Sequence, residues 1–253
     1  MDKEKKPRSI EVKERVKLKI GDKEYEFESD TPTPLFYTDL YDEITAGYDA
    51  TELFPLGKIQ VLDSAGAVGA EITSDNWTLT CEATKISITG SAVWNSDNPP
   101  ATLKVLDTRG FTYFQTSLPA GISAQRGLPI TVTWEASFSM TVSSATGYLA
   151  GASITYTAYI ARLVNILGNA REGKSLSIRK AIYRYTDGYE WAVNVVGEMG
   201  QRRIYLPATQ VPKAGSIDNV SLCTSANECF AFALSSLLNV SSGDYVSLDI
   251  YFV

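Results

Sequence analysis

The chain has 253 residues, a formal net charge of −6 and 44% hydrophobic residues, and it contains no histidine. The missing histidine excludes a Ser-His-Asp or Cys-His nucleophile, histidine-ligated zinc and an imidazole acid or base. The acidic balance argues against a direct nucleic-acid partner, because phosphate contacts are made chiefly by clustered Lys and Arg.

The first 30 residues hold 18 of the 52 charged side chains, nine of each sign. The charged start is not followed by the run of about 7–15 apolar residues that a secretory signal needs. No stretch approaches the ~20 apolar residues of a membrane-spanning helix either. We therefore expect synthesis in the cytoplasm without a signal peptide, and no membrane partner.

Within this N-terminal region, Val16-Lys-Leu-Lys-Ile20 and Glu24-Tyr-Glu-Phe-Glu28 alternate apolar with charged residues around Gly21-Asp22. This pattern predicts a β-hairpin with one buried face. Residues 2–15 are too polar to bury anything alone, so we expect a disordered tail or an arm that orders on a neighbour. Thr31-Pro-Thr-Pro34 predicts an extended connector. We expect residues 1–36 to form a charged arm that contacts another subunit.

The next region, residues 37–146, is rich in Thr, Ser, Val, Ile and aromatic residues and has turn clusters at short intervals. Short strands at such spacing are typical of a β-sandwich or a jelly-roll-like barrel. The expected strands are Lys58–Leu62, Trp77–Cys81, Lys85–Ile88, Ala101–Leu106, Phe111–Thr116 and Ile130–Met140.

The last region, residues 147–253, is a second β-rich module with one short helix. Apolar residues recur at helical spacing over residues 159–167 and end at Gly168, which suits a helix C-terminus. Ser175–Tyr185 and Tyr189–Val196 alternate around Asp187-Gly188, a strong hairpin signal. Phe230–Leu234 and Tyr245–Val253 are expected to close the chain as strands.

The two modules end alike. Leu103–Met140 and Val220–Val253 share one order of features: an apolar strand, a turn, an aromatic strand, a loop, a Gly turn and a long closing strand. This similarity suggests an internal repeat. The expected fold is mainly β, with two tandem β-sandwich or jelly-roll-like modules, an N-terminal β-hairpin arm and one short helix.

One segment, Gly168-Asn-Ala-Arg-Glu-Gly173-Lys174-Ser175, matches the phosphate-binding loop G-x-x-x-x-G-K-[ST]. That chemistry needs a buried strand before the loop and a helix after it. Here the expected helix precedes the loop and a strand pattern follows it, so the order is reversed. We interpret Gly168, Gly173, Lys174 and Ser175 as a surface loop and expect no bound cofactor. A nucleotide-binding protein remains the less favoured alternative.

Other candidate sites also have simpler interpretations. Glu135, Asp187, Glu190 and Glu198 could serve a glycosidase, but nothing in the sequence pairs them in space. The segments 74–76 and 95–98 lack the ligand pattern of a calcium loop and are interpreted as turns. Large aromatic residues in strands are usually core, so we expect this of the four tryptophans, which are Trp77, Trp94, Trp134 and Trp191. We therefore expect no catalytic and no metal-binding residues.

The three cysteines are Cys81, Cys223 and Cys229. An odd number of cysteines in a chain without a secretory signal favours buried or surface thiols in a reducing compartment. A bridge between Cys223 and Cys229 across a loop is the alternative.

The closing pattern of Leu103–Met140 and Val220–Val253 resembles minor structural proteins of tailed bacterial and archaeal viruses. Tyr159-Ile-Ala-Arg-Leu-Val-Asn-Ile-Leu-Gly-Asn, followed by hairpin strands, is similar to the short helix that opens a β domain in some of them. The resemblance implies a non-enzymatic virion protein, made in the host cytoplasm, that multimerises in a capsid decoration, turret, neck, tail or fibre. Its partners would be copies of itself and other virion proteins. The alternative is a carbohydrate-binding or adhesive β-sandwich.

Overall fold

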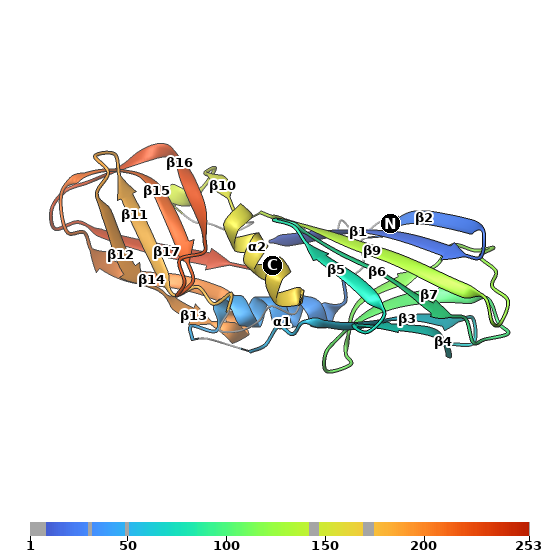
Figure 1. The fold of residues 1–253 in the computed structure, drawn as a ribbon. Coiled ribbons are helices and arrows are strands. Elements are labelled where there is room, and N and C mark those ends of the chain that lie inside the picture. The colour runs from blue at the N-terminus through green and yellow to red at the C-terminus, as the bar shows by residue number, and fades with distance from the viewer. Residues whose placement is uncertain (1–8, 30–31, 49–50, 142–146, 169–174, 253) are drawn as a thin grey trace, which may run out of the picture.

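The computed structural model describes residues 9–29, 32–48, 51–141, 147–168 and 175–252. They form several antiparallel sheets and two α-helices, which confirms the mainly β class. Figure 1 shows an elongated body with a β-sandwich at each end and the two helices between them. No helix in these ranges is long and apolar enough to cross a membrane.

The first sandwich consists of a five-stranded sheet, sheet A, and a four-stranded sheet, sheet B. Sheet A has the order β2-β1-β9-β6-β5, with β1 at Ile10–Ile20, β2 at Lys23–Ser29, β5 at Trp77–Cys81, β6 at Lys85–Val93 and β9 at Pro129–Met140. Sheet B has the order β4-β3-β7-β8, with β3 at Leu56–Asp63, β4 at Val68–Thr73, β7 at Pro100–Asp107 and β8 at Thr112–Ser117. The ring centroids of Phe114 from sheet B and Trp134 from sheet A lie 4.9 Å apart, so the two sheets share one core.

The second sandwich consists of the three-stranded sheet C and the five-stranded sheet D. Sheet C has the order β13-β14-β17, with β13 at Val196–Glu198, β14 at Arg203–Gln210 and β17 at Tyr245–Tyr251. Sheet D has the order β10-β16-β15-β11-β12, with β10 at Ser153–Thr155, β11 at Lys180–Tyr185, β12 at Glu190–Asn194, β15 at Gly215–Cys223 and β16 at Cys229–Val240. Two 3₁₀ turns, η1 at Gly147–Leu149 and η2 at Met199–Gln201, complete the described elements.

One helix, α1 at Pro34–Thr45, precedes β3 to β9, and the other, α2 at Thr157–Leu167, precedes β11 to β17. The expected helix over residues 159–167 is confirmed as α2. The prediction of a single helix is wrong, because α1 begins where the sequence indicated an extended connector. Pro34 occupies the first turn of α1, where a helix needs no N–H from it, and the Thr33 hydroxyl accepts a 3.3 Å hydrogen bond from the Phe36 N–H. Proline therefore starts this helix instead of preventing it.

The two sandwiches repeat one topology. Strands β3 to β9 and β11 to β17 correspond in sequence order: β4-β3-β7-β8 matches β12-β11-β15-β16, and β5-β6-β9 matches β13-β14-β17. The correspondence includes the segment before each helix, since Pro32 bridges to Phe114 of β8 and β10 pairs with β16. Equal strand order is what the predicted internal repeat requires, and the repeat unit extends from the segment before a helix to the seventh strand after that helix.

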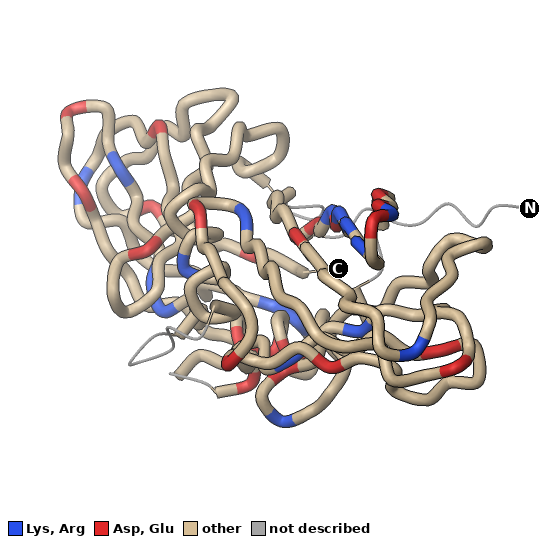
Figure 2. The backbone as a smooth tube through the Cα atoms, turned by 45° about the vertical axis from the view of Figure 1, so that its right-hand side comes forward, with Lys and Arg blue, Asp and Glu red and all other residues tan. Residues whose placement is uncertain are grey.

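The N-terminal hairpin is confirmed in its turn and pairing, because Ile20 lies opposite Lys23 across Gly21-Asp22. Its expected role as a separate arm is wrong. β1 pairs with β9 over eleven residue pairs, from Ile10 opposite Met140 to Ile20 opposite Ile130. The hairpin is therefore part of the first sandwich, and the domain boundary expected at residue 36 falls inside this unit. Figure 2 shows the charges of β1 and β2 lying side by side at one edge of sheet A.

Two further expectations differ from the structure in detail. All six strands expected in residues 37–146 are present, but β4 was not predicted. Cys223 and Cys229 form a disulfide instead of two thiols. They lie directly opposite each other in the β15–β16 pairing, with Cα atoms 4.1 Å apart, so the hairpin itself brings them together. Cys81 lies outside the disulfide, and its thiol donates a 3.6 Å hydrogen bond to the carbonyl of Val164.

Candidate functional site

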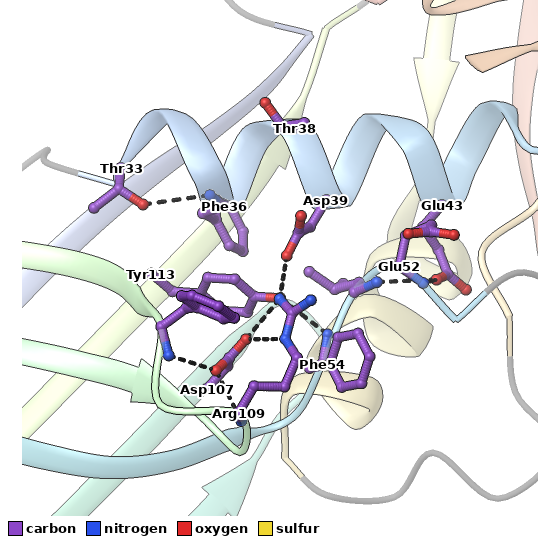
Figure 3. Close-up of polar contacts among 12 residues, drawn as sticks. Thr33, Phe36, Thr38, Asp39, Glu43, Glu52, Phe54, Asp107, Arg109 and Tyr113 are labelled. Atoms are coloured by element: carbon purple, nitrogen blue, oxygen red, sulfur yellow. Dashed lines mark hydrogen bonds and ion pairs between the residues drawn. The ribbon is translucent and has the colours of Figure 1, made fainter. Parts of the chain in front are cut away.

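The densest set of charged contacts among the described residues lies under α1, where a turn of sheet B meets the helix (Figure 3). The turn is Asp107-Thr-Arg-Gly110 between β7 and β8. Oδ1 of Asp107 accepts 2.9 Å hydrogen bonds from the N–H groups of Arg109 and Phe111. Gly110 has φ of +91°, a conformation that glycine adopts without strain. These bonds hold the turn so that Arg109 projects toward α1.

Arg109 bridges the turn and the helix. Its Nε donates a 2.7 Å hydrogen bond to Oδ2 of Asp107, and its Nη2 donates to Oδ2 of Asp39 in α1. The hydroxyl of Tyr113 donates to the same Asp39 oxygen at 2.8 Å. The guanidinium carbon also lies 3.8 Å from the ring centroid of Phe54, a favourable cation–π distance. The cation is thus held by two carboxylates and an aromatic face.

The groups of this cluster form structural contacts between α1 and sheet B. Burial raises the pKa of Tyr113 far above its usual range, so its phenol stays protonated. Asp39 and Asp107 are occupied by Arg109, and Arg109 is a permanent cation. The cluster therefore contains no activated nucleophile with a free base beside it, and we assign it the role of fixing α1 on sheet B.

A second buried carboxylate, Glu43 at the end of α1, joins the two sandwiches. Its Oε2 accepts hydrogen bonds from the N–H groups of Glu52 and Leu53 at 2.8 and 3.1 Å. Its Oε1 accepts a 3.4 Å hydrogen bond from the N–H of Leu176, and its backbone carbonyl accepts one of 2.8 Å from Ser177. Because Glu43 has no exposed surface, its polar groups need such partners, and these contacts link the first sandwich to the start of the second.

The helix α2 completes this junction from the other side. Nε of Arg162 donates a 2.6 Å hydrogen bond to the carbonyl of Ser175, and its Nη1 pairs with Glu228 at 2.5 Å. The Tyr159 hydroxyl donates to the carbonyl of Leu176 at 2.6 Å. The segment 175–178 is thereby held between α2 and Glu43 of α1. Figure 1 shows the two helices at the centre of the molecule.

This placement bears on the phosphate-loop match. Gly173 and Lys174 lie outside the described residues, but the flanks are described. α2 precedes the segment and an extended segment leads from Ser175 into β11, the reverse of the order that phosphate binding needs. The interpretation as a surface loop is wrong for Ser175, which is 4% exposed and whose hydroxyl donates to Ser177, because it lies within the junction. Gly168 closes α2 against β5, since a Cβ there would lie 2.3 Å from the sulfur of Cys81.

The four carboxylates considered for glycoside hydrolysis lie on different elements. Glu135 pairs with Lys85 at 2.8 Å on sheet A, and Asp187 pairs with Lys213 at 2.5 Å in a turn. Glu198 pairs with Arg203 at 3.3 Å on sheet C, whereas Glu190 is exposed on β12. No hydrogen bond or ion pair among the described residues joins two of these four carboxylates. No group of three or more Cys, Asp or Glu able to hold a metal ion occurs within the ranges described.

The expected turns and core aromatics have clear roles. Ser96 and Asn98 from the 95–98 turn donate hydrogen bonds to Oδ2 of Asp63, at 2.5 and 3.2 Å. Oδ1 of Asp63 accepts from the N–H groups of Ala65 and Ala67, so this carboxylate joins two turns of the first sandwich. The tryptophans are core residues as predicted. Trp94 and Trp134 are fully buried. Trp77 and Trp191 are partly buried and packed against the core.

An accessible cluster of a different kind lies on the outer face of sheet C. Arg203 of β14 makes two 2.7 Å hydrogen bonds to the carboxylate of Asp249 on β17, and these bonds raise the pKa of Arg203. Its guanidinium carbon lies 4.4 Å from the Tyr205 ring centroid and 5.6 Å from that of Tyr251. Arginine and tyrosine are enriched in protein interfaces. This cluster, Arg203, Tyr205, Asp249 and Tyr251, is the candidate interaction site.

Sequence reasoning identified neither Arg109 nor Arg203 as a site residue. The only local signal was the Asp107–Gly110 turn, which predicted a hairpin but not the helix that it would face. Comparison with protein-family models, with curated proteins and with solved structures found no match to this chain. The geometry defines a tandem β-sandwich protein, and its function has to be argued from that geometry.

Proposed function

We propose that this protein is a non-enzymatic structural subunit of a virion that multimerises in a capsid- or tail-associated assembly. The observation that carries the proposal is the tandem construction, in which two sandwiches of equal strand order are joined through buried contacts of Glu43. An elongated body of this kind suits a structural subunit that spans between its neighbours in an assembly. The resemblance of its two closing segments to minor virion proteins supports the viral setting.

The polar clusters favour the same function. Arg109 and Glu43 use their charges to hold helix α1 in place. The described charged groups with the most contacts therefore have a structural role. The outer face of sheet C carries the arginine and tyrosine side chains that interfaces favour. Because closed oligomers require a self-complementary or a heterologous patch on every copy, an accessible cluster of this composition is where assembly contacts are expected.

A carbohydrate-binding or adhesive role is the second candidate, favoured by one observation. The outer face of sheet A has two hollows of about 600 and 510 Å³. Their lining is mostly Lys, Arg, Glu, Ser and Thr, with Tyr25 as the one aromatic residue. Sugar sites combine polar groups with aromatic stacking surfaces. This face of sheet A offers many polar groups but little aromatic surface.

The test is the state of the purified full-length chain. We expect multi-angle light scattering to give a defined oligomer at micromolar concentration, and negative-stain electron microscopy to show regular particles or lattices. A monomer at every concentration tested would contradict the assembly role. Binding on a glycan array would promote the adhesive role, and a thermal shift with ATP or GTP would promote nucleotide binding. We expect neither.

A further inference from the structure

We propose that the free edge of β17 docks β17 of a second copy in antiparallel orientation, so that sheet C continues from one copy into the next. The inference rests on the proposed assembly function and names the surface and the partner. The combined sheet would have the order β13-β14-β17 followed by the same three strands reversed. The site consists of the edge of β17 and the adjoining cluster of Arg203, Tyr205 and Tyr251.

The first observation comes from the internal repeat. β9 of the first sandwich corresponds to β17 of the second, and β6 corresponds to β14. The second edge of β9 is filled by β1 over eleven residue pairs. No strand among the described residues fills the same edge of β17. The hydroxyl of Tyr148 reaches it, through a 2.9 Å hydrogen bond to the carbonyl of Ser247. Among the described residues, the position that the hairpin occupies in one sandwich holds no strand in the other.

The backbone of β17 is directed so that it can accept a strand there. The N–H of Phe252 donates a 2.9 Å hydrogen bond to the carbonyl of Arg202, on the side of β14. Backbone groups alternate in direction along an antiparallel strand, so Ile250 also faces β14. The N–H and C=O groups of Asp249 and Tyr251 consequently point away from β14. They are the donors and acceptors that strand addition uses.

The side chains of β17 do not protect this edge. The edge strand β2 carries Lys23, Glu24, Glu26 and Glu28, and charge of this kind discourages edge-to-edge pairing. β17 has the sequence Tyr-Val-Ser-Leu-Asp-Ile-Tyr, and its single charge, Asp249, is neutralised by Arg203. Two copies of β17 can therefore approach without repulsion between like charges. This charge balance is what favours a second copy as the occupant.

The outer faces of sheets A and C, next to these edges, also differ: that of sheet C is better suited to an interface. On the outer face of sheet A, hydroxyl side chains bond to each other across β6 and β9, as Thr89 does with Thr133 at 3.0 Å. On sheet C the corresponding strands present Tyr205 and Tyr251 around Arg203, and Val196 beside them is 41% exposed. Aromatic residues and arginine supply most hot spots of protein interfaces.

The occupied carbonyl of Ser247 selects the register. Beyond Ser247, the outward backbone groups of β17 belong to Asp249 and Tyr251, so the proposed pairing sets Asp249 of one copy opposite Tyr251 of the other. Ile250 then lies on the twofold axis. The interface is isologous, because each copy contributes the same strand.

The decisive comparison is between Tyr251→Pro and Tyr251→Ala in the full-length chain. Both remove the ring, but only proline removes an N–H that points away from β14, and edge positions tolerate proline. We expect sedimentation equilibrium to show a dissociation constant raised about tenfold in Tyr251→Ala and about a hundredfold or more in Tyr251→Pro. The thermal unfolding midpoints of the two variants should agree closely.

Each outcome has one meaning. If the wild type is monomeric throughout, the assembly function and this interface both fail. If the wild type assembles and Tyr251→Pro assembles equally well, this edge is not the interface and the assembly function stands. If Tyr251→Pro does not fold, hydrogen exchange of the wild type decides. Slowed exchange of the Asp249 and Tyr251 amides in the concentrated sample, lost on dilution, supports the proposal, and unchanged exchange overturns it.

Discussion

The indole nitrogen of Trp134 donates a 2.9 Å hydrogen bond to Oε2 of Glu14, and this contact joins the N-terminal hairpin to the centre of the first sandwich. Trp134 is fully buried and Glu14 is 2% exposed. A carboxylate is stable in such a place only when hydrogen bonds compensate for its lost hydration. The contact shows that β1 belongs to the core and does not serve as a detachable arm.

Deleting residues 1–29 should therefore abolish the fold of the first sandwich. The deletion removes the strand that covers β9 and exposes Trp134 together with Val132. We expect loss of the near-ultraviolet circular dichroism signal and of a cooperative thermal transition. Deleting residues 1–8 leaves β1 complete and is the control, with an unchanged transition. A folded protein lacking residues 1–29, with a native melting temperature, would contradict the role assigned to the hairpin.

Arg109→Met should destabilise the protein by about 2 kcal/mol. The substitution leaves the carboxylates of Asp39 and Asp107 without their cation, which costs about 3–5 kcal/mol at fully buried sites and less here because the Arg109 side chain is 30% exposed. Urea unfolding monitored by fluorescence measures the difference. Arg126→Met is the matched control, since Arg126 and Asp97 pair at 3.6 Å with both side chains well exposed. Equal effects of the two substitutions would argue against the fastening role of Arg109.

Asp63 should make stability depend on pH in the acid range. The hydrogen bond from Ser96, helped by those from Ala67, Asn98 and Ala65, lowers the pKa of Asp63 to about 2. The unfolded chain binds the proton near pH 3.8 and the folded chain only near pH 2, so this stabilisation is present above pH 3.8 and is lost between those values. Urea titrations from pH 5 to 2 should show a steeper loss for the wild type than for Asp63→Asn. Parallel curves would show that the carboxylate is not held in this way.

The disulfide between Cys223 and Cys229 should stabilise the second sandwich by about 2 kcal/mol, because it closes a short loop in the unfolded chain. Dithiothreitol should lower the melting temperature of the wild type, and it should have no effect on Cys229→Ser. Intact-mass measurement before and after reduction reports the bond directly. Cys81→Ser, with the bond intact, provides the control for thiol effects elsewhere. A wild type that shows no reducible bond would contradict this prediction.

Hairpins were the most predictable part of the fold. The turns Gly21-Asp22 and Asp187-Gly188 and their flanking strands were identified because a hairpin is specified by residues close together in the chain. The expected strands of the first sandwich were identified for the same reason. α1 was missed because Pro32 precedes it and Pro34 is its first residue, although Phe36, Leu40 and Ile44 recur at helical spacing and are all fully buried.

The amino-acid sequence by itself determined the β class, the local hairpins and the tandem repeat, because alternation and turn residues act over a few positions. Only the tertiary structure decided where β1 belongs and what Arg109 does. Its partner Asp39 lies 70 positions away in the chain, and Glu14 lies 120 positions from Trp134. Pairing between such distant residues depends on how the sheets close over one core. No local pattern carries that information, because every charged residue of a strand or turn looks solvent-exposed until its partner is placed.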